Sequence, residues 1–175
     1  MTPLKIVAFL LIGISSLIIG AVMLAKPLAV GSQAPDFKLQ DDHGNWRTLS
    51  EFNGKKVVVY FYPKDDTPGC TKEACSLRDS AQEYSKHGIV VIGISYDSVE
   101  SHKEFKATYH LPFILLSDPT RKVTKKYHAA SVLFGYFFPK RITYLIENGK
   151  ICYVFKKIDV STHGDDILKA FNIKT

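Results

Sequence analysis

Two short runs of β-branched and aromatic residues constrain the fold of this chain more than any other feature. Residues 57–62 read VVVYFY and residues 89–95 read IVVIGIS. A strand that is apolar on both faces must be covered on both sides, which is typical of the central strands of an α/β sheet. Residues 67–87, which lie between the two runs, have the pattern of a helix. The sequence therefore predicts helices packed on a buried central sheet.

The rest of the chain continues this alternation of strands and helices. The other predicted elements are, in order, a helix at 99–109, a strand at 112–116, a helix at 120–127, strands at 142–146 and 151–155, and a helix at 162–171. Asn148-Gly149 is a strong signal for a hairpin turn between the last two strands. Ser161 is predicted to cap the last helix. The order of elements indicates an α/β sandwich with a mixed central sheet.

The amino-terminal residues differ in kind from the rest. No residue from 6 to 25 carries a charge, and Lys5 and Lys26 bracket the stretch. A helix of about 20 apolar residues spans a bilayer core of about 30 Å. A cleaved signal peptide would have an apolar region of about 7–15 residues and a small-x-small cleavage site. The stretch at 6–25 is longer than that and lacks the small residue at the first position of the best candidate site, Met23-Leu24-Ala25. We therefore expect residues 1–28 to be a membrane anchor, as a transmembrane helix or an uncleaved signal, and residues 29–175 to be one domain.

This anchor gives an expected location for the domain. Lysines flank the apolar stretch on both sides, so the positive-inside rule favours a domain outside the cytoplasm only slightly. The expectation is a single-pass protein of a bacterial inner membrane, with the domain facing the periplasm. Residues 26–36, with two prolines and a glycine, read as a linker. The net charge is +6, but no nucleic-acid-binding motif or aromatic stacking platform accompanies it, so no nucleic-acid partner is expected.

Residues 63–75, PKDDTPGCTKEAC, lie where the first buried strand passes into a helix. Thr67 is placed as the helix cap and Pro68 as the first helical residue. Cys70 then falls in the first turn, where the partial positive charge and unpaired N–H groups of a helix N-terminus favour a thiolate. The thiolate is the nucleophilic form of cysteine. The alternative is an inert buried cysteine, which would not call for Thr-Pro-Gly before it.

Cys75 follows Cys70 by five residues. In an ideal helix this spacing puts the two Cα atoms roughly 8–9 Å apart. A disulfide needs Cα atoms within about 7 Å, so the pair cannot bond while the helix is intact. If the two cysteines are partners, the helix must unwind by a turn or more. The alternative is that Cys75 is a bystander thiol.

These residues also carry a resemblance to a known family. Residues 31–79 read GSQAPDFKLQDDHGNWRTLSEFNGKKVVVYFYPKDDTPGCTKEACSLRD, and this segment resembles peroxiredoxins of the bacterioferritin-comigratory, or Q-type, subfamily. The later pieces ISYDS, LLSDP, KRITYLIENGKI and THGDDIL are similar to it as well. The resemblance covers about residues 30–175. It implies a thioredoxin-like fold, reduction of hydrogen peroxide and organic hydroperoxides, and recycling by thioredoxin or a similar dithiol protein.

The resemblance also implies roles for five residues. Cys70 matches the peroxidatic cysteine and Cys75 the resolving cysteine of many members. Pro63 and Thr67 match the proline and threonine of the P-x-x-x-T-x-x-C signature, and Arg141 matches the arginine that reaches the thiolate. The resemblance implies a sulfenic acid on Cys70 that condenses with Cys75. Because the sulfur atoms are the redox centre, neither a metal nor an organic cofactor is expected, and the chain is expected to be a monomer or a weak dimer.

Several residues have two interpretations. Arg121 is a rival for the arginine role, although its place near a helix start favours a solvated side chain. Glu73 either orients Arg141 or is a solvated helix residue. Cys152, on the second hairpin strand, is interpreted as a packing residue. The apolar run VLFGYFF at 132–138 is interpreted as core or as a wall of the active site.

Two other functions compete with a peroxidase. The first is a thiol–disulfide oxidoreductase of similar fold, which the lack of a C-x-x-C pair disfavours. The second is a membrane-tethered redox sensor that passes oxidation to a partner through Cys70. A peroxide-consumption assay separates the sensor from the enzyme, because a sensor would turn over slowly.

Overall fold

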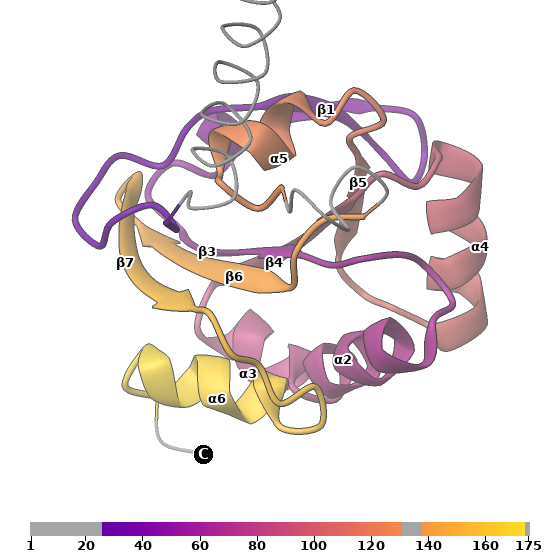
Figure 1. Cartoon of the computed structure of the whole chain (residues 1–175). Helices are drawn as coiled ribbons and strands as arrows, with labels where there is room; N and C mark the ends of the chain where they lie inside the picture. The colour runs from indigo at the N-terminus through magenta and orange to yellow at the C-terminus, as the bar shows by residue number, and fades with distance from the viewer. Residues whose placement is uncertain (1–25, 131–137, 174–175) are drawn as a thin grey trace, which may run out of the picture.

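A seven-stranded mixed sheet forms the centre of the computed structural model, which describes residues 26–130 and 138–173 (Figure 1). In spatial order the strands are β2 (Trp46–Thr48), β1 (Lys38–Asp41), β5 (Ile114–Ser117), β4 (Ile89–Ser95), β3 (Lys56–Phe61), β6 (Ile142–Glu147) and β7 (Lys150–Phe155). Strands β3, β4 and β5 are parallel to one another. The outer strands pair in antiparallel fashion, so the sheet is mixed, as predicted.

Helices cover both faces of this sheet. Figure 1 shows α2 (Pro68–Asp79), α3 (Ala81–Lys86) and α6 (His163–Ala170) on one side and α5 (Lys122–Lys126) on the other. The side chain of Phe105, from α4 (Val99–Tyr109), belongs to the same core as α2 and α6. The short 3-10 helix η1 (Leu49–Phe52) packs with α5 on the opposite face.

Strand β3 shows why the apolar run at 57–62 forms the centre of the fold. Val58, Tyr60 and Tyr62 belong to the core on the α2 face, whereas Val57, Val59 and Phe61 belong to the core on the α5 face. Successive side chains of a strand point to opposite faces, so each face receives every second residue. All six side chains are buried, which confirms the predicted strand that is covered on both sides.

The Asn148-Gly149 turn joins β6 to β7 as predicted. Both residues have positive φ, 51° and 72°, which is the backbone of a type I′ hairpin turn. Glu147 pairs with Lys150 across the turn. The turn fixes the direction of β6, whose other end lies beside the loop that follows β3.

Three local features differ from the sequence-based expectation. The helix expected at 67–87 divides at Ser80, so that Tyr84 of α3 reaches the core and donates a hydrogen bond to the Gly164 carbonyl at 2.9 Å. No glycine or proline marks this division. The cap of α6 is Thr162, and the hydroxyl of Ser161 donates to Asp159 instead. The β1–β2 hairpin and η1 were not predicted.

Residues 26–36 are not a free linker. Backbone hydrogen bonds join Gly31 N–H to the Ile151 carbonyl at 2.7 Å and Ile151 N–H to the Ser32 carbonyl at 2.9 Å. The segment therefore lies along part of the β7 edge. The predicted membrane-spanning helix falls on residues 6–25, which lie outside the described residues. In the two described ranges, no helix is both long enough and apolar enough to cross a membrane.

Candidate active site

Cys70 occupies the position that the sequence predicts for it, in the first turn of α2. Thr67 precedes the helix with extended backbone angles, and Pro68 is the first helical residue. The side chain of Cys70 is 2% exposed. Because the first N–H groups of a helix have no partner within it, the sulfur lies at the positive end of the α2 dipole.

Arg141 reaches the sulfur from the neighbouring strand. It directly precedes β6, whose first residue Ile142 pairs with Phe61, the last residue of β3. The Nη2 group of Arg141 donates to the Sγ atom of Cys70 at 3.2 Å. A Cβ atom on Gly69 would lie 3.4 Å from this Nη2, so the backbone of the first turn of α2 passes close to the guanidinium. The two ends of the predicted site, 71 residues apart in the sequence, are thus in contact.

Glu73 holds the other side of the guanidinium. Its side chain is completely buried, and Oε2 accepts a hydrogen bond from Arg141 Nη1. Burial raises the pKa of Glu73 to about 7, against the opposing effect of the Arg141 charge. Burial acts to lower the pKa of Arg141, but Glu73 and Cys70 together raise it. A charged guanidinium therefore lies between sulfur and carboxylate, which decides between the two interpretations of Glu73 in favour of orienting Arg141.

Two further buried residues, which sequence reasoning missed, lie behind Glu73. His163 Nε2 is 3.8 Å from Glu73 Oε1 and 2.9 Å from Thr143 Oγ1. Burial lowers the pKa of His163 to about 4, so the imidazole is neutral at pH 7. Thr143 is two residues after Arg141 in extended backbone and so lies on the same face of the sheet. This spacing could have predicted Thr143 as a site residue from the sequence. His163 opens α6 and offers no such signal.

Replacing Glu73 with glutamine is expected to change how stability depends on pH. An unfolded glutamate loses its proton near pH 4.3, whereas folded Glu73 keeps it up to about pH 7. The folded state binds more protons between these values, so the Glu73 contribution to stability falls as pH rises through this window. Glutamine does not titrate, so Glu73→Gln should gain stability relative to wild type by up to about 1.4 kcal/mol per pH unit. Urea unfolding at pH 5 and pH 7 measures this, and a pH-independent difference would contradict it.

Thr67 and Pro63 lie on the loop that leads into α2. The Thr67 hydroxyl donates to the Lys64 carbonyl at 3.0 Å, so its proton is not directed to Cys70 and its lone pairs remain to accept a hydrogen bond. Pro63 is half-buried. It lines a cleft of about 210 Å³ together with Lys64, Tyr96, Asp97 and Phe138.

Cys75 lies on the same unbroken helix as Cys70. Helix α2 runs through both residues, and all three cysteines of the chain are free. The helix geometry keeps the two Cα atoms roughly 8–9 Å apart, beyond the reach of a disulfide. In this structure the helix between the two cysteines is unbroken, so the pair is not positioned to bond.

Three secondary interpretations have clear outcomes. Cys152 is exposed on β7, so the interpretation as a packing residue is wrong. Its partial burial raises the pKa of its thiol. Arg121 is half-buried with its guanidinium 5.3 Å from the centre of the Tyr96 ring, and so is not the arginine at the sulfur. Residues 131–137 lie outside the described residues, and Phe138 at the end of that run is 39% exposed beside Pro63.

The fold and site together define a class of protein. Cys70 lies in the first turn of a helix, and Arg141, just before β6, donates to its sulfur. Buried Glu73 accepts a hydrogen bond from the same arginine. This arrangement is suited to redox chemistry at an activated thiol. Residues 30–154 match the AhpC/TSA family, so the chain belongs to this family.

Relatives agree with this assignment. Peroxiredoxin Q, chloroplastic, from Oryza sativa subsp. japonica is 52% identical over 126 residues, which are 71% of this chain and 58% of the rice protein. The chain thus spans less than two thirds of the length of this relative. A Coxiella burnetii protein that carries the name peroxiredoxin bcp is 47% identical over 146 residues. These residues are 81% of this chain and 97% of that protein.

Solved structures agree as well. Peroxidoxin BcpB from Mycobacterium tuberculosis is 34% identical with a TM-score of 0.77, over 83% of this chain and 97% of its own. The Xanthomonas campestris bacterioferritin comigratory protein is 31% identical with a TM-score of 0.73, over 78% of this chain and 90% of its own. Its structure was solved to study its alkyl peroxide reduction activity. The predicted Q-type resemblance and the thioredoxin-like mixed-sheet fold are confirmed.

These relatives are named as peroxiredoxins or, in the Xanthomonas case, studied for alkyl peroxide reduction. They also correct one expectation. The predicted location in a bacterial inner membrane, with the domain facing the periplasm, is wrong, because the chain matches a chloroplastic peroxiredoxin and a bacterial peroxiredoxin of the bcp type.

Proposed function

We propose that this chain reduces hydrogen peroxide and organic hydroperoxides through the sulfur of Cys70. The observation that carries the proposal is the contact of 3.2 Å between Arg141 Nη2 and Cys70 Sγ at the start of α2. A fixed cation beside the sulfur stabilises the thiolate and the negative charge that develops on a departing oxygen. The alkyl peroxide reduction activity of the Xanthomonas relative supports organic hydroperoxides as substrates.

The first step is attack of the Cys70 thiolate on one oxygen of the peroxide. A sulfur–oxygen bond forms, the oxygen–oxygen bond breaks, and water or an alcohol leaves after taking up a proton. Cys70 becomes a sulfenic acid, and the peroxide has gained two electrons. Arg141 stabilises the transition state, Thr67 accepts a hydrogen bond from the peroxide O–H, and Pro63 excludes water from the loop side.

The second step joins the two cysteines of α2. The Cys75 thiolate attacks the sulfur of the sulfenic acid, the sulfur–oxygen bond breaks, the hydroxide takes up a proton from solvent to leave as water, and a disulfide forms. The geometry of an intact helix forbids this bond, so α2 must unwind between the two residues. In the third step a thioredoxin-like dithiol exchanges with the disulfide and supplies the two electrons. The cycle contributes to antioxidant defence and cell redox homeostasis.

The proposal is tested by peroxide consumption with thioredoxin, thioredoxin reductase and NADPH. Steady turnover that depends on Cys70 supports the enzyme. Oxidation of Cys70 once, without turnover, would instead support a redox sensor. The disulfide-oxidoreductase alternative is not favoured, because the spacing of Cys70 and Cys75 differs from C-x-x-C.

A further inference from the structure

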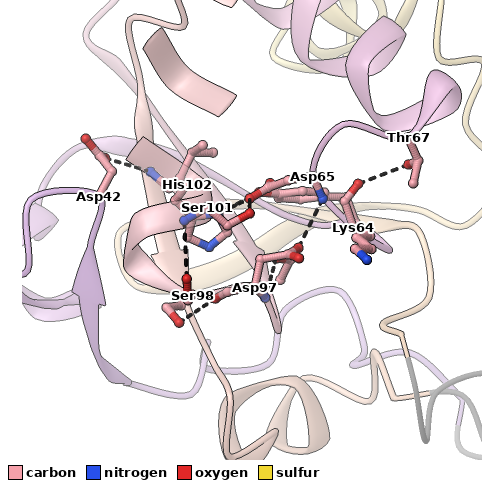
Figure 2. Close-up of polar contacts among 12 residues, drawn as sticks. Asp42, Lys64, Asp65, Thr67, Asp97, Ser98, Ser101 and His102 are labelled. Atoms are coloured by element: carbon pink, nitrogen blue, oxygen red, sulfur yellow. Dashed lines mark hydrogen bonds and ion pairs between the residues drawn. The ribbon is translucent and has the colours of Figure 1, made fainter. Parts of the chain in front are cut away.

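The loop between β3 and α2 is joined to α4 through the buried carboxylate of Asp65 and through a contact of 3.3 Å between the Tyr62 hydroxyl and His102 Nδ1. Asp65 is 5% exposed, and its Oδ1 accepts a hydrogen bond from the Tyr62 hydroxyl at 2.7 Å. Its Oδ2 accepts from the Ser101 hydroxyl at 2.7 Å and lies 2.8 Å from His102 Nδ1 (Figure 2). We call Tyr62, Asp65, Ser101 and His102 the Asp65 cluster.

The backbone of the same residue is tied to a second element. The Asp65 N–H donates to Asp97 Oδ2 at 3.0 Å, just beyond the end of β4 (Figure 2). The Ser95 hydroxyl donates to the same oxygen at 2.6 Å and so fixes its position. Both the side chain and the backbone of Asp65 are therefore held.

The surroundings of His102 favour the tautomer that donates a hydrogen bond to Asp65. Its side chain is completely buried, and Nε2 has no hydrogen-bond partner among the residues that the structure describes. A buried lone pair without a partner costs less than a buried N–H without one, so the proton belongs on Nδ1, where Asp65 accepts it. Burial alone would raise the pKa of Asp65, but the hydrogen bonds from His102, Tyr62 and Ser101 lower it.

The anchored residue precedes a strained one. Asp66 has a φ of 56°, a left-handed conformation that is uncommon for residues other than glycine. This conformation sets the direction in which the chain enters Thr67 and the first turn of α2. A residue keeps a strained conformation only when the surrounding structure fixes it. The hydrogen bonds of the Asp65 cluster fix the residue that precedes Asp66.

We propose that Asp65 and His102 are positioning residues, which rests on the proposed peroxidase function. They hold the 63–67 loop so that the α2 N-terminus presents Cys70 to Arg141, and they remain fixed while α2 unwinds toward Cys75. Loosening the cluster should therefore have opposite effects on the two steps. The peroxide step slows because Cys70 is misplaced, whereas the disulfide step becomes faster because the first turn of α2 frays more easily.

Two substitutions of His102 separate positioning from packing. His102→Phe keeps a ring but removes the Nδ1 donor. His102→Asn removes the ring but places an amide nitrogen near the Nδ1 position. Rapid mixing with hydrogen peroxide, chemical quenching and mass spectrometry give both rates. We expect His102→Phe to slow the peroxide step about 10- to 100-fold and to speed the disulfide step, and His102→Asn to keep both rates within about threefold of wild type.

Other outcomes distinguish the possible failures. Equal loss in both His102 variants, or parallel slowing of both steps, would overturn the positioning role. If His102→Phe does not fold, Ser101→Ala removes one hydrogen bond to the same carboxylate and should shift the two rates in the same opposite directions; no shift would overturn the proposal. If the wild-type chain consumes no peroxide, the proposed function fails, whereas an active wild type with unchanged variants refutes this inference alone.

Discussion

Replacing Cys70 with serine is expected to reduce peroxide consumption to the rate measured without protein. The serine hydroxyl fills nearly the same buried volume, so α2 and its contacts should be retained. An oxygen in place of the sulfur cannot form a sulfenic acid, and a hydroxyl is a weak nucleophile at neutral pH. Consumption of hydrogen peroxide in the thioredoxin-coupled assay measures the loss.

The matched control for this prediction is Cys152→Ser. Cys152 is exposed on β7, where its Sγ contacts the Leu145 carbonyl at 3.4 Å. This variant should keep the wild-type rate. If Cys70→Ser retained more than about a tenth of the wild-type rate while folded, Cys70 would not be the attacking residue.

Replacing Arg141 with alanine is expected to lower kcat/KM for hydrogen peroxide by about 10²–10³-fold, the range observed when one preorganised donor to a developing charge is removed. The variant loses both the donor to Cys70 Sγ and the cation that faces it. Arg141→Lys keeps the charge but cannot donate from two nitrogens to Cys70 and Glu73 at once, so it should recover only part of the loss.

Stability must be separated from catalysis in this experiment. Arg141→Ala leaves Glu73 Oε2 buried without its hydrogen-bond donor and raises the pKa of Glu73 further, so a buried charge or an unpaired polar group destabilises the fold. The double variant Arg141→Ala, Glu73→Gln removes that penalty. It should recover stability but not activity. Recovery of the wild-type kcat/KM in the double variant would show that Arg141 acts on the fold alone.

The sequence predicts the parts of this protein that local patterns encode. The run at 57–62 predicts β3, and Asn148-Gly149 predicts the β6–β7 turn, because side-chain alternation and turn chemistry are local. The place of Cys70 follows from Thr67 and Pro68, which mark the start of a helix. Arg141 was found through the resemblance to a family and not from its own surroundings.

Tertiary contacts between distant residues could not be predicted in the same way. Asp65 and His102 are 37 residues apart, and their pairing depends on α4 packing beside the loop after β3. His163 approaches Glu73 only because α6 packs on α2. The division of the helix at Ser80 follows from the packing of Tyr84. Cys152 was wrongly assigned to packing because the exposed face of an edge strand depends on what covers the sheet.

We propose that Cys70 bonds to Cys75 when the helix that activates Cys70 unwinds. One equivalent of hydrogen peroxide, followed by mass mapping of the disulfide and amide hydrogen exchange of the same sample, tests this step. We expect a Cys70–Cys75 disulfide and loss of exchange protection over residues 70–76, with protection kept in the reduced protein. The same disulfide with unchanged protection, or a disulfide between Cys70 and Cys152, would contradict it.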